Sequence, residues 1–107
     1  MKKSSYENFF ANFSNYTRIK IILALADKPL SVSELVKKIN EEQSNISHHL
    51  QQMSHCNLVQ VKKEGKKRIY ALNEKTVKPI LKMAQEHVFG NCAKCVGNCR
   101  ACMGEIR

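Results

Sequence analysis

The sequence predicts a mainly α-helical protein with one small β-hairpin, in the element order ααααββα, followed by a cysteine-rich C-terminal segment. Three observations predict this class. Apolar residues recur at helical spacing in five stretches, one later stretch alternates between apolar and polar residues around a glycine, and cysteines are concentrated near the C-terminus. The length suits one folded domain, which we expect over residues 1–90, with the cysteine segment over 91–107.

The first helix is expected over residues 5–14. Its large apolar side chains follow the spacing i, i+3, i+4 and i+7, which places them on one helical face. They are Tyr6, Phe9, Phe10 and Phe13. Because this apolar surface is large for a short helix, either the core or a second subunit must cover it.

The second and third helices are expected over 16–26 and 31–40. Asn15 can cap the second helix, and Asp27-Lys28-Pro29 ends it, because the residue before a proline avoids the helical conformation. The residues expected to face inward are Ile19, Ile22, Leu23 and Ala26. Ser31 and Glu34 have the spacing of a capping box at the start of the third helix. The apolar residues of that helix are Val32, Leu35, Val36 and Ile39.

The fourth helix is expected from a cap at Ser44 to near Cys56, where Asn57 suits the left-handed residue that follows a helix. Its buried side is expected to contain Ile46, Leu50 and Met53. A hairpin follows over 59–72, with its turn at Glu64-Gly65.

The last helix is expected from about Thr76 to Phe89-Gly90, and Pro79 is tolerated in its first turn. Its apolar face contains Val77, Ile80, Leu81, Ala84 and Val88.

The third and fourth helices are short and joined by a tight turn, which is the pattern of a helix-turn-helix. Opposite its buried side, the fourth helix has a polar side without acidic residues, formed by Ser44, His48, Gln51, Gln52 and His55, with Asn45 and Ser47 on the flanks. Serine, asparagine and glutamine can hydrogen-bond to base edges in the major groove. The alternative is an ordinary solvated helix face.

The predicted hairpin is strongly basic. Five cations surround its turn: Lys62, Lys63, Lys66, Lys67 and Arg68. Lysines can also protect an exposed edge strand from aggregation, but beside a helix-turn-helix they favour a wing that contacts DNA phosphates or the minor groove. The formal net charge of +9 agrees with a polyanionic partner. The sequence therefore predicts a winged helix-turn-helix that binds double-stranded DNA.

The segment Leu35 through Leu72 resembles the ArsR/SmtB family of winged-helix repressors. The recognition-helix signature is Gln43-Ser44-Asn45-Ile46-Ser47-His48-His49-Leu50, and Asn57-Leu58-Val59, the basic wing with Gly65 and Tyr70-x-Leu72 also match. The resemblance spans residues 5–89. It implies that Gln43, Ser44, Asn45, Ser47 and His48 face DNA. His49 projects closer to the buried edge, where we expect a structural hydrogen bond.

The same resemblance implies a homodimer in which the first and last helices pair across the two-fold axis, and repression that ends when a ligand binds. The expected interface residues are Tyr6, Phe9, Phe10, Phe13, Ile80, Leu81, Ala84 and Val88.

The sequence departs from the metal sites of the family. A Cys-x-Cys pair at the third helix is replaced by Ser31-Val32-Ser33, and the Asp and His pairs of the last helix are reduced to adjacent Glu86 and His87. We therefore expect the sensing chemistry elsewhere.

Cys92, Cys95, Cys99 and Cys102 form C-x2-C-x3-C-x2-C within a short repeat. Thiolates at this density can bind zinc, cadmium, copper(I), arsenic(III) or the irons of an iron–sulfur cluster. They can also form disulfides in a redox switch, and incidental cysteines in a disordered segment are a further alternative. Cys56 is expected to be a small buried hydrophobic residue, although it could join a thiol of the cysteine segment and so couple ligand binding to the recognition helix.

The main hypothesis is thus a repressor released from its operator by a metal, metalloid or thiol-redox signal. One alternative is a redox regulator without metal, and another is an iron–sulfur electron-transfer protein, which the basic wing disfavours. The sequence has no phosphate loop and no paired acid and base, so we do not expect an enzyme. No apolar stretch is long enough to cross a bilayer and no secretion signal is present, so we expect a cytoplasmic protein that does not contact membranes.

Overall fold

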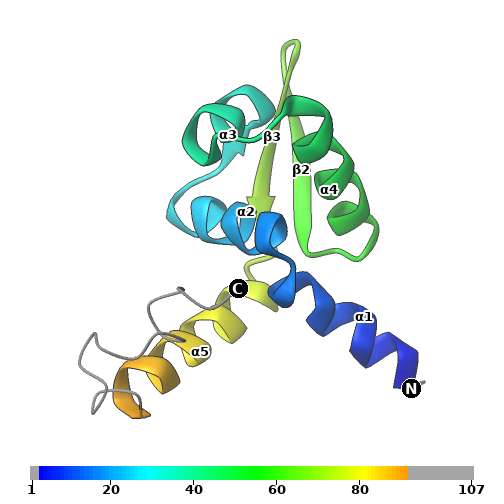
Figure 1. Ribbon diagram of the computed structural model, residues 1–107. Helices are drawn as coiled ribbons and strands as arrows, with labels where there is room; N and C mark the ends of the chain where they lie inside the picture. The colour runs from blue at the N-terminus through cyan, green and yellow to red at the C-terminus, as the bar shows by residue number, and fades with distance from the viewer. Residues whose placement is uncertain (1–2, 92–107) are drawn as a thin grey trace. The chain divides into compact units, whose positions relative to one another are not determined.

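The computed structural model describes residues 3–91 of the chain (Figure 1). The chain divides into two compact units, Met1–Asn73 and Glu74–Arg107. The helices of the first unit are α1 (Lys3–Ser14), α2 (Tyr16–Asp27), α3 (Val32–Ile39) and α4 (Gln43–His55), and its strands are β1 (Leu30–Ser31), β2 (Val59–Glu64) and β3 (Lys67–Leu72). The described part of the second unit contains α5 (Val77–Asn91). The predicted mainly helical fold with a hairpin is confirmed.

The strands form a three-stranded antiparallel sheet in the order β1-β3-β2. In the β2–β3 hairpin the pairing runs from Val59 opposite Leu72 to Glu64 opposite Lys67. Gly65 at the turn has a φ of 63°, a left-handed conformation that glycine adopts without a steric penalty. In Figure 1 the turn of the hairpin extends beyond α3 and α4.

Strand β1 was not predicted from the sequence. It has only two residues, so it offers no alternating pattern, and it forms because the extended chain that leads into α3 lies against β3. Leu30 pairs with Tyr70, and Ser31 pairs with Ile69.

Local hydrogen bonds fix the starts of α2 and α3 as predicted. The side chain of Asn15 accepts a hydrogen bond from the backbone N–H of Arg18 at 3.0 Å. Ser31 and Glu34 form the capping box: Ser31 Oγ accepts from the Glu34 N–H at 3.3 Å, and Glu34 Oε1 accepts from the Ser31 N–H at 2.9 Å.

The prediction that Ser44 caps α4 was wrong. The N-cap is Glu42, whose carbonyl accepts from the N–H of Ile46 at 3.1 Å and whose side chain makes no capping hydrogen bond. Ser44 therefore lies inside the first turn. At the other end of α4, Asn57 has a φ of 58°, so the left-handed residue after the helix is confirmed.

The core of the first unit is formed by α2, α3, α4 and the sheet, and its fully buried residues include Ile21, Ile22, Leu25, Leu35, Ile46, Leu50, Met53, Leu58, Val59 and Leu72. The buried side of α4 is as predicted. For α2 the prediction is confirmed at Ile22, which is completely buried, but is wrong at Leu23. Leu23 is 49% exposed, whereas Ile21, Ala24 and Leu25 are buried. Because apolar residues surround the axis of α2 almost completely, their spacing does not determine which side faces the core.

Helix α5 begins near the predicted position and continues past Phe89 and Gly90 to Asn91. The prediction that Phe89-Gly90 ends the helix was therefore wrong. Gly90 does not adopt the left-handed conformation that would make it a C-terminal cap, and a glycine can stay helical at a modest cost. None of the described helices is both long enough and apolar enough to span a membrane.

Candidate nucleic-acid interface

Helices α3 and α4 are joined by residues 40–42. Asn40 stops α3 because it adopts a left-handed conformation with a φ of 62°, and its N–H donates to the carbonyl of Val36. The completely buried residues Ile46, Leu50 and Met53 hold α4 against the core and leave its opposite side outside. The predicted helix-turn-helix is therefore present.

Most of the residues predicted to contact DNA from α4 are exposed: Gln43, Ser44, Ser47, His48 and Gln51. Asn45 differs, because its side chain is half-buried and its Nδ2 donates to Glu41 Oε1 at 3.1 Å. Its amide thus faces the connection between the two helices, which limits its freedom to contact a base.

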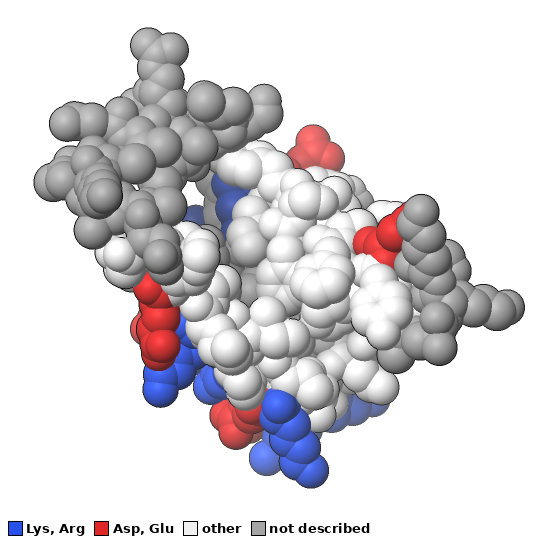
Figure 2. Space-filling view, turned by 90° about the horizontal axis from the view of Figure 1, so that it is seen from below, with Lys and Arg blue, Asp and Glu red and all other residues white. Residues whose placement is uncertain are grey.

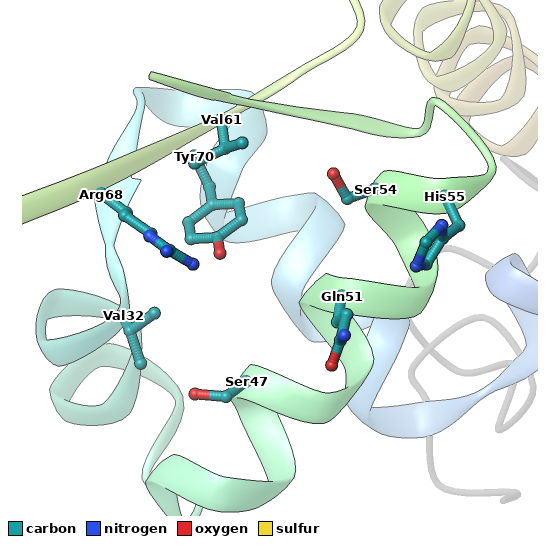
Figure 3. A pocket seen from close by; sticks show the side chains of 8 residues that line it. All are labelled: Val32, Ser47, Gln51, Ser54, His55, Val61, Arg68 and Tyr70. Atoms are coloured by element: carbon teal, nitrogen blue, oxygen red, sulfur yellow. The ribbon is translucent and has the colours of Figure 1, made fainter. Parts of the chain in front are cut away.

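A groove with a volume of about 490 Å³ lies between α4, the start of α3 and the strands of the hairpin. It is lined by Val32, Ser47, Gln51, Ser54, His55, Val61, Arg68 and Tyr70. In Figure 3, Arg68 and Tyr70 project from β3 into the groove, and Ser47 projects from α4 towards Val32. Side chains of α4 and a cation of the hairpin therefore share one concave surface.

The five cations of the hairpin, which we call the wing cations, are all exposed: Lys62, Lys63, Lys66, Lys67 and Arg68. The register brings Lys63 opposite Arg68 and Glu64 opposite Lys67. None of the wing cations forms an ion pair within the described residues. A smaller depression of about 260 Å³ is lined by Lys66, Lys67 and Arg68 together with Ser31, Val32 and Ser33 at the start of α3. This surface is suited to an anionic partner.

His49 makes the structural hydrogen bond expected for it. Its Nδ1 accepts from Arg18 Nε at 2.9 Å. Burial, followed by the positive charges of Arg18 and His48, lowers the pKa of His49 from its ordinary value of 6.5, and Glu41 opposes this shift. The role of Arg18 was not predicted, because a single arginine in an apolar helix belongs to no recognisable motif.

Cys56 is exposed, so the expectation that it is a buried hydrophobic residue was wrong. It is the C-terminal cap of α4, where the chain turns towards β2, and the core is filled by Met53 and Leu58 on either side.

The predicted ligands Cys92, Cys95, Cys99 and Cys102 lie outside the described residues. Within residues 3–91, no three His, Cys, Asp or Glu side chains are grouped closely enough to hold a metal ion.

The residues predicted for a dimer interface vary in exposure. On α1, Tyr6 is 53% and Phe10 58% exposed, whereas Phe9 and Phe13 are half-buried. Figure 2 shows that uncharged side chains predominate on the face that includes α1. On α5, Ile80, Ala84 and Val88 are exposed, but Leu81 is buried and offers little surface to a partner. Met83 and Phe89, which were not predicted, are 70% and 77% exposed.

Known proteins similar to this chain include bacterial and archaeal transcriptional regulators. The family model described as "Bacterial regulatory protein, arsR family" matches residues 15–61. The HTH-type transcriptional regulator MJ1325 of Methanocaldococcus jannaschii is 31% identical over 78 residues, which are 72% of this chain and 88% of the relative. A homologue of the cadmium resistance regulatory protein CadC from Staphylococcus aureus is 30% identical over 79 residues, covering 73% and 65% of the two chains.

The HTH-type transcriptional regulator KmtR of Mycobacterium tuberculosis is 26% identical over 72 residues, which are 67% of this chain. The match spans only 55% of KmtR, so the chain corresponds to about half of that relative.

Two solved structures have the same fold. HlyU from Vibrio cholerae, which is named a transcriptional activator, superimposes with a TM-score of 0.70 at 29% identity, over 78% of this chain and 94% of HlyU. The homodimeric winged helix-turn-helix domain of Mb0332 from Mycobacterium bovis has a TM-score of 0.69 at 20% identity, over 81% and 84% of the chains. The second likeness supports the fold alone.

Proposed function

The chain belongs to the ArsR family of bacterial regulatory proteins, and from this premise we propose that it is a homodimeric DNA-binding transcriptional repressor. Helix α4 enters the major groove and contacts base edges, while the wing cations contact phosphates or the adjacent minor groove. The observation that carries the proposal is the groove that is lined by Ser47 and Gln51 of α4 together with Arg68 of the hairpin.

The chemistry of this groove suits DNA. Ser47 and Gln51 are uncharged, so they can donate to and accept from base edges without a strong preference for phosphate. The wing cations are exposed and form no salt bridge among the described residues, so their charges are available to phosphates. Ser47 and Gln51 should therefore specify the DNA sequence, and the wing cations should supply affinity.

The test is the binding of the full chain to a duplex selected from a random library, measured over a range of salt concentrations. Replacing Lys66 by Ala should weaken binding to all duplexes and reduce the slope of log K against log salt by about 1 for each bound subunit, because each subunit loses one phosphate contact. Replacing Gln51 by Ala should leave the slope unchanged and reduce the preference for the selected duplex by about 1–3 kcal/mol per lost base contact.

Lys82→Ala provides the matched control. Lys82 is an exposed lysine of α5, outside the groove and the hairpin, and its loss should leave the salt slope unchanged. If Lys66→Ala and Lys82→Ala have equal slopes, the hairpin is not a DNA-contacting wing. If the unsubstituted chain has no preference for duplex DNA over a simple polyanion, the whole proposal is rejected.

Dimerisation through α1 and α5 is part of the proposal. The apolar side chains Tyr6 and Phe10 are more than half exposed in the single chain, which favours a partner surface over solvent. The Mb0332 domain, which has the same fold, is homodimeric, so the fold is compatible with a dimer.

We further propose that the cysteine segment receives the inducing signal. Its donor set consists of four thiols, which suits soft or borderline ions such as zinc, cadmium, copper(I) and arsenic(III), or an iron–sulfur cluster. A relative is named for cadmium resistance, which supports a response to metals. When bound, such an ion would join neighbouring thiolates of the cysteine segment to one another, and this would restrain the chain that follows α5.

Replacing Cys92, Cys95, Cys99 and Cys102 together by Ser should abolish the response to inducer and leave DNA binding intact. The measurement is DNA release on addition of cadmium, zinc, arsenite or an oxidant to the reduced protein. Metal analysis and thiol counting on anaerobically purified protein separate a metal site from a disulfide switch. A response that persists in the fourfold variant would place the sensor outside the cysteine segment.

A further inference from the structure

Arg18 occupies an unusual position in the first unit. It lies in the first turn of α2, it is only partly exposed, and it lines neither the groove of Figure 3 nor the hairpin. Three nitrogens of its guanidinium group donate to three side chains on two other helices. Nε donates to His49 Nδ1 at 2.9 Å, Nη1 donates to Asn12 Oδ1 at 2.7 Å, and Nη2 donates to Gln52 Oε1. A planar guanidinium presents its donors in fixed directions from three separate nitrogens, whereas a lysine has a single nitrogen at the end of a flexible side chain.

The acceptor on α1 is itself held in place. Asn12 is 1% exposed, and its Nδ2 donates to the backbone carbonyls of Asn8 and Phe9, both at 3.0 Å. Because these two bonds occupy the NH₂ end of the amide, Oδ1 is directed to Arg18. The buried amide thus fixes Arg18 to α1, the helix that carries the exposed Phe10.

The acceptors on α4 are His49 and Gln52, which are three residues apart and therefore neighbours on the helix surface. His49 must be neutral to accept at Nδ1, so its proton is on Nε2. Burial, Arg18 and His48 lower the pKa of His49, against the opposing effect of Glu41, and this keeps the ring neutral at neutral pH.

These two attachments restrict rotation of α4 about its axis. His49 and Gln52 immediately follow His48 and Gln51, which we assign to the DNA-facing side. A rotation of α4 that turned Ser47 and Gln51 away from Arg68 would also break the bonds to Arg18. The apolar contacts of Ile46, Leu50 and Met53 hold the helix in the core but are less directional than these hydrogen bonds.

We propose that Arg18 is a positioning residue for DNA recognition, which fixes the orientation of α4 through His49 and Gln52 and couples it to α1 through Asn12. This inference rests on the proposed function. It makes α1 a structural support of the recognition helix as well as a candidate dimerisation helix, so that a change at α1 is transmitted to the DNA-contacting side chains.

The test compares Arg18→Met with Arg68→Met, the same chemical change at an arginine that lines the groove. Arg18→Met should lower affinity for the selected duplex about tenfold or more, because hydrogen bonds from a charged donor are lost, and should leave the salt slope unchanged. Arg68→Met should reduce that slope by about 1 for each bound subunit. Circular dichroism and sedimentation show whether each variant remains folded and dimeric.

Failure of the inference about Arg18 and failure of the proposed function give different results. If the unsubstituted chain binds the selected duplex and Arg18→Met binds it equally well, the inference is wrong and the proposed function stands. If Arg18→Met reduces the salt slope as Arg68→Met does, Arg18 contacts a phosphate and is not a positioning residue. If the unsubstituted chain has no duplex preference, the proposed function itself fails.

A second set of variants tests the coupling. His49→Asn retains an acceptor oxygen near the position of Nδ1 and should keep affinity close to that of the unsubstituted chain, whereas His49→Phe should lose about as much as Arg18→Met. Asn12→Ala should weaken binding when Arg18 is present and have no effect in the Arg18→Met background. An undiminished effect in that background would contradict coupling through Arg18.

One measurement needs no variant and remains informative if Arg18→Met does not fold. Nitrogen-15 NMR of the histidine rings at neutral pH should show His49 with an unprotonated Nδ1 and a protonated Nε2. A proton on Nδ1 would exclude the hydrogen bond from Arg18 and overturn the inference.

Discussion

At the scale of single residues, two side chains start two helices by accepting hydrogen bonds from backbone N–H groups that have no partner within the helix. Asn15 does so for α2, and Ser31 does so for α3. Both act on groups three residues away in the chain. Their effect on stability should therefore be local and separable from the packing of the core.

Asn15→Ala should lower the free energy of unfolding by about 1 kcal/mol, because the N–H of Arg18 loses its acceptor. Ser44→Ala is the matched comparison, since Ser44 was expected from the sequence to cap α4 but lies inside the helix. It should change stability by less than about 0.5 kcal/mol, as exposed substitutions usually do. Chemical denaturation of both variants measures the difference, and equal losses would contradict this assignment of the caps.

The contrast between Asn15 and Ser44 shows which residue roles the sequence can predict. The caps at Asn15 and Ser31 follow from residue type and from a nearby apolar stretch. Ser44 satisfies the same criteria, but α4 already begins at Gln43, with Glu42 as its N-cap, so Ser44 lies inside the helix. The hydrogen bond of His49 was predicted from its position near the buried side, but its donor Arg18 is 31 residues away in the sequence and has no local signal.

At the scale of elements, the start of α3 links helix capping to pH. The carboxylate of Glu34 accepts a hydrogen bond from the backbone of Ser31 and interacts with its hydroxyl, and these two contacts lower the pKa of Glu34 below its ordinary value of 4.5. The charges of Lys28 and Lys67 act in the same direction, and some desolvation opposes them. The capping box is therefore strongest when Glu34 is ionised.

Between the folded pKa of Glu34 and 4.5, the unfolded chain binds more protons than the folded chain. The contribution of Glu34 is thus fully present above pH 4.5 and is lost as the pH falls through the folded pKa. Glu34→Gln can still accept the hydrogen bond but does not titrate, so its stability should fall less steeply on acidification. Parallel pH curves for the two proteins, from thermal or chemical denaturation, would rule out this role.

The arrangement of elements was more predictable than their contacts. Five helices and a hairpin follow from spacing and turn residues, because a turn such as that at Gly65 is encoded locally. The short strand β1 forms by pairing with β3, and the paired residues are far apart in the sequence: Leu30 with Tyr70 and Ser31 with Ile69. It therefore has no local pattern. The prediction of the core side of α2 was wrong at Leu23 for a related reason. The apolar residues of α2 fit several orientations, and the neighbouring elements select one.

At the scale of the whole molecule, the proposed dimer must bury apolar side chains that a single chain leaves exposed. Phe10 is 58% exposed on α1, and it contacts the ring of Phe9 edge-on with 5.2 Å between centroids. Leu23 on α2 is 49% exposed and lies outside the predicted interface. These two residues allow a test that separates specific association from general hydrophobicity.

Phe10→Glu should shift the monomer–dimer equilibrium towards the monomer by about tenfold or more, because a buried aromatic contact is replaced by a charge that must be desolvated. Leu23→Glu should leave the equilibrium unchanged, and sedimentation over a range of protein concentrations measures both. The loss of dimer should weaken binding to an operator with two half-sites more than binding to a single half-site, since each subunit contacts one half-site. Equal dissociation constants for Phe10→Glu and the unsubstituted chain would instead assign the exposed face of α1 to a different partner.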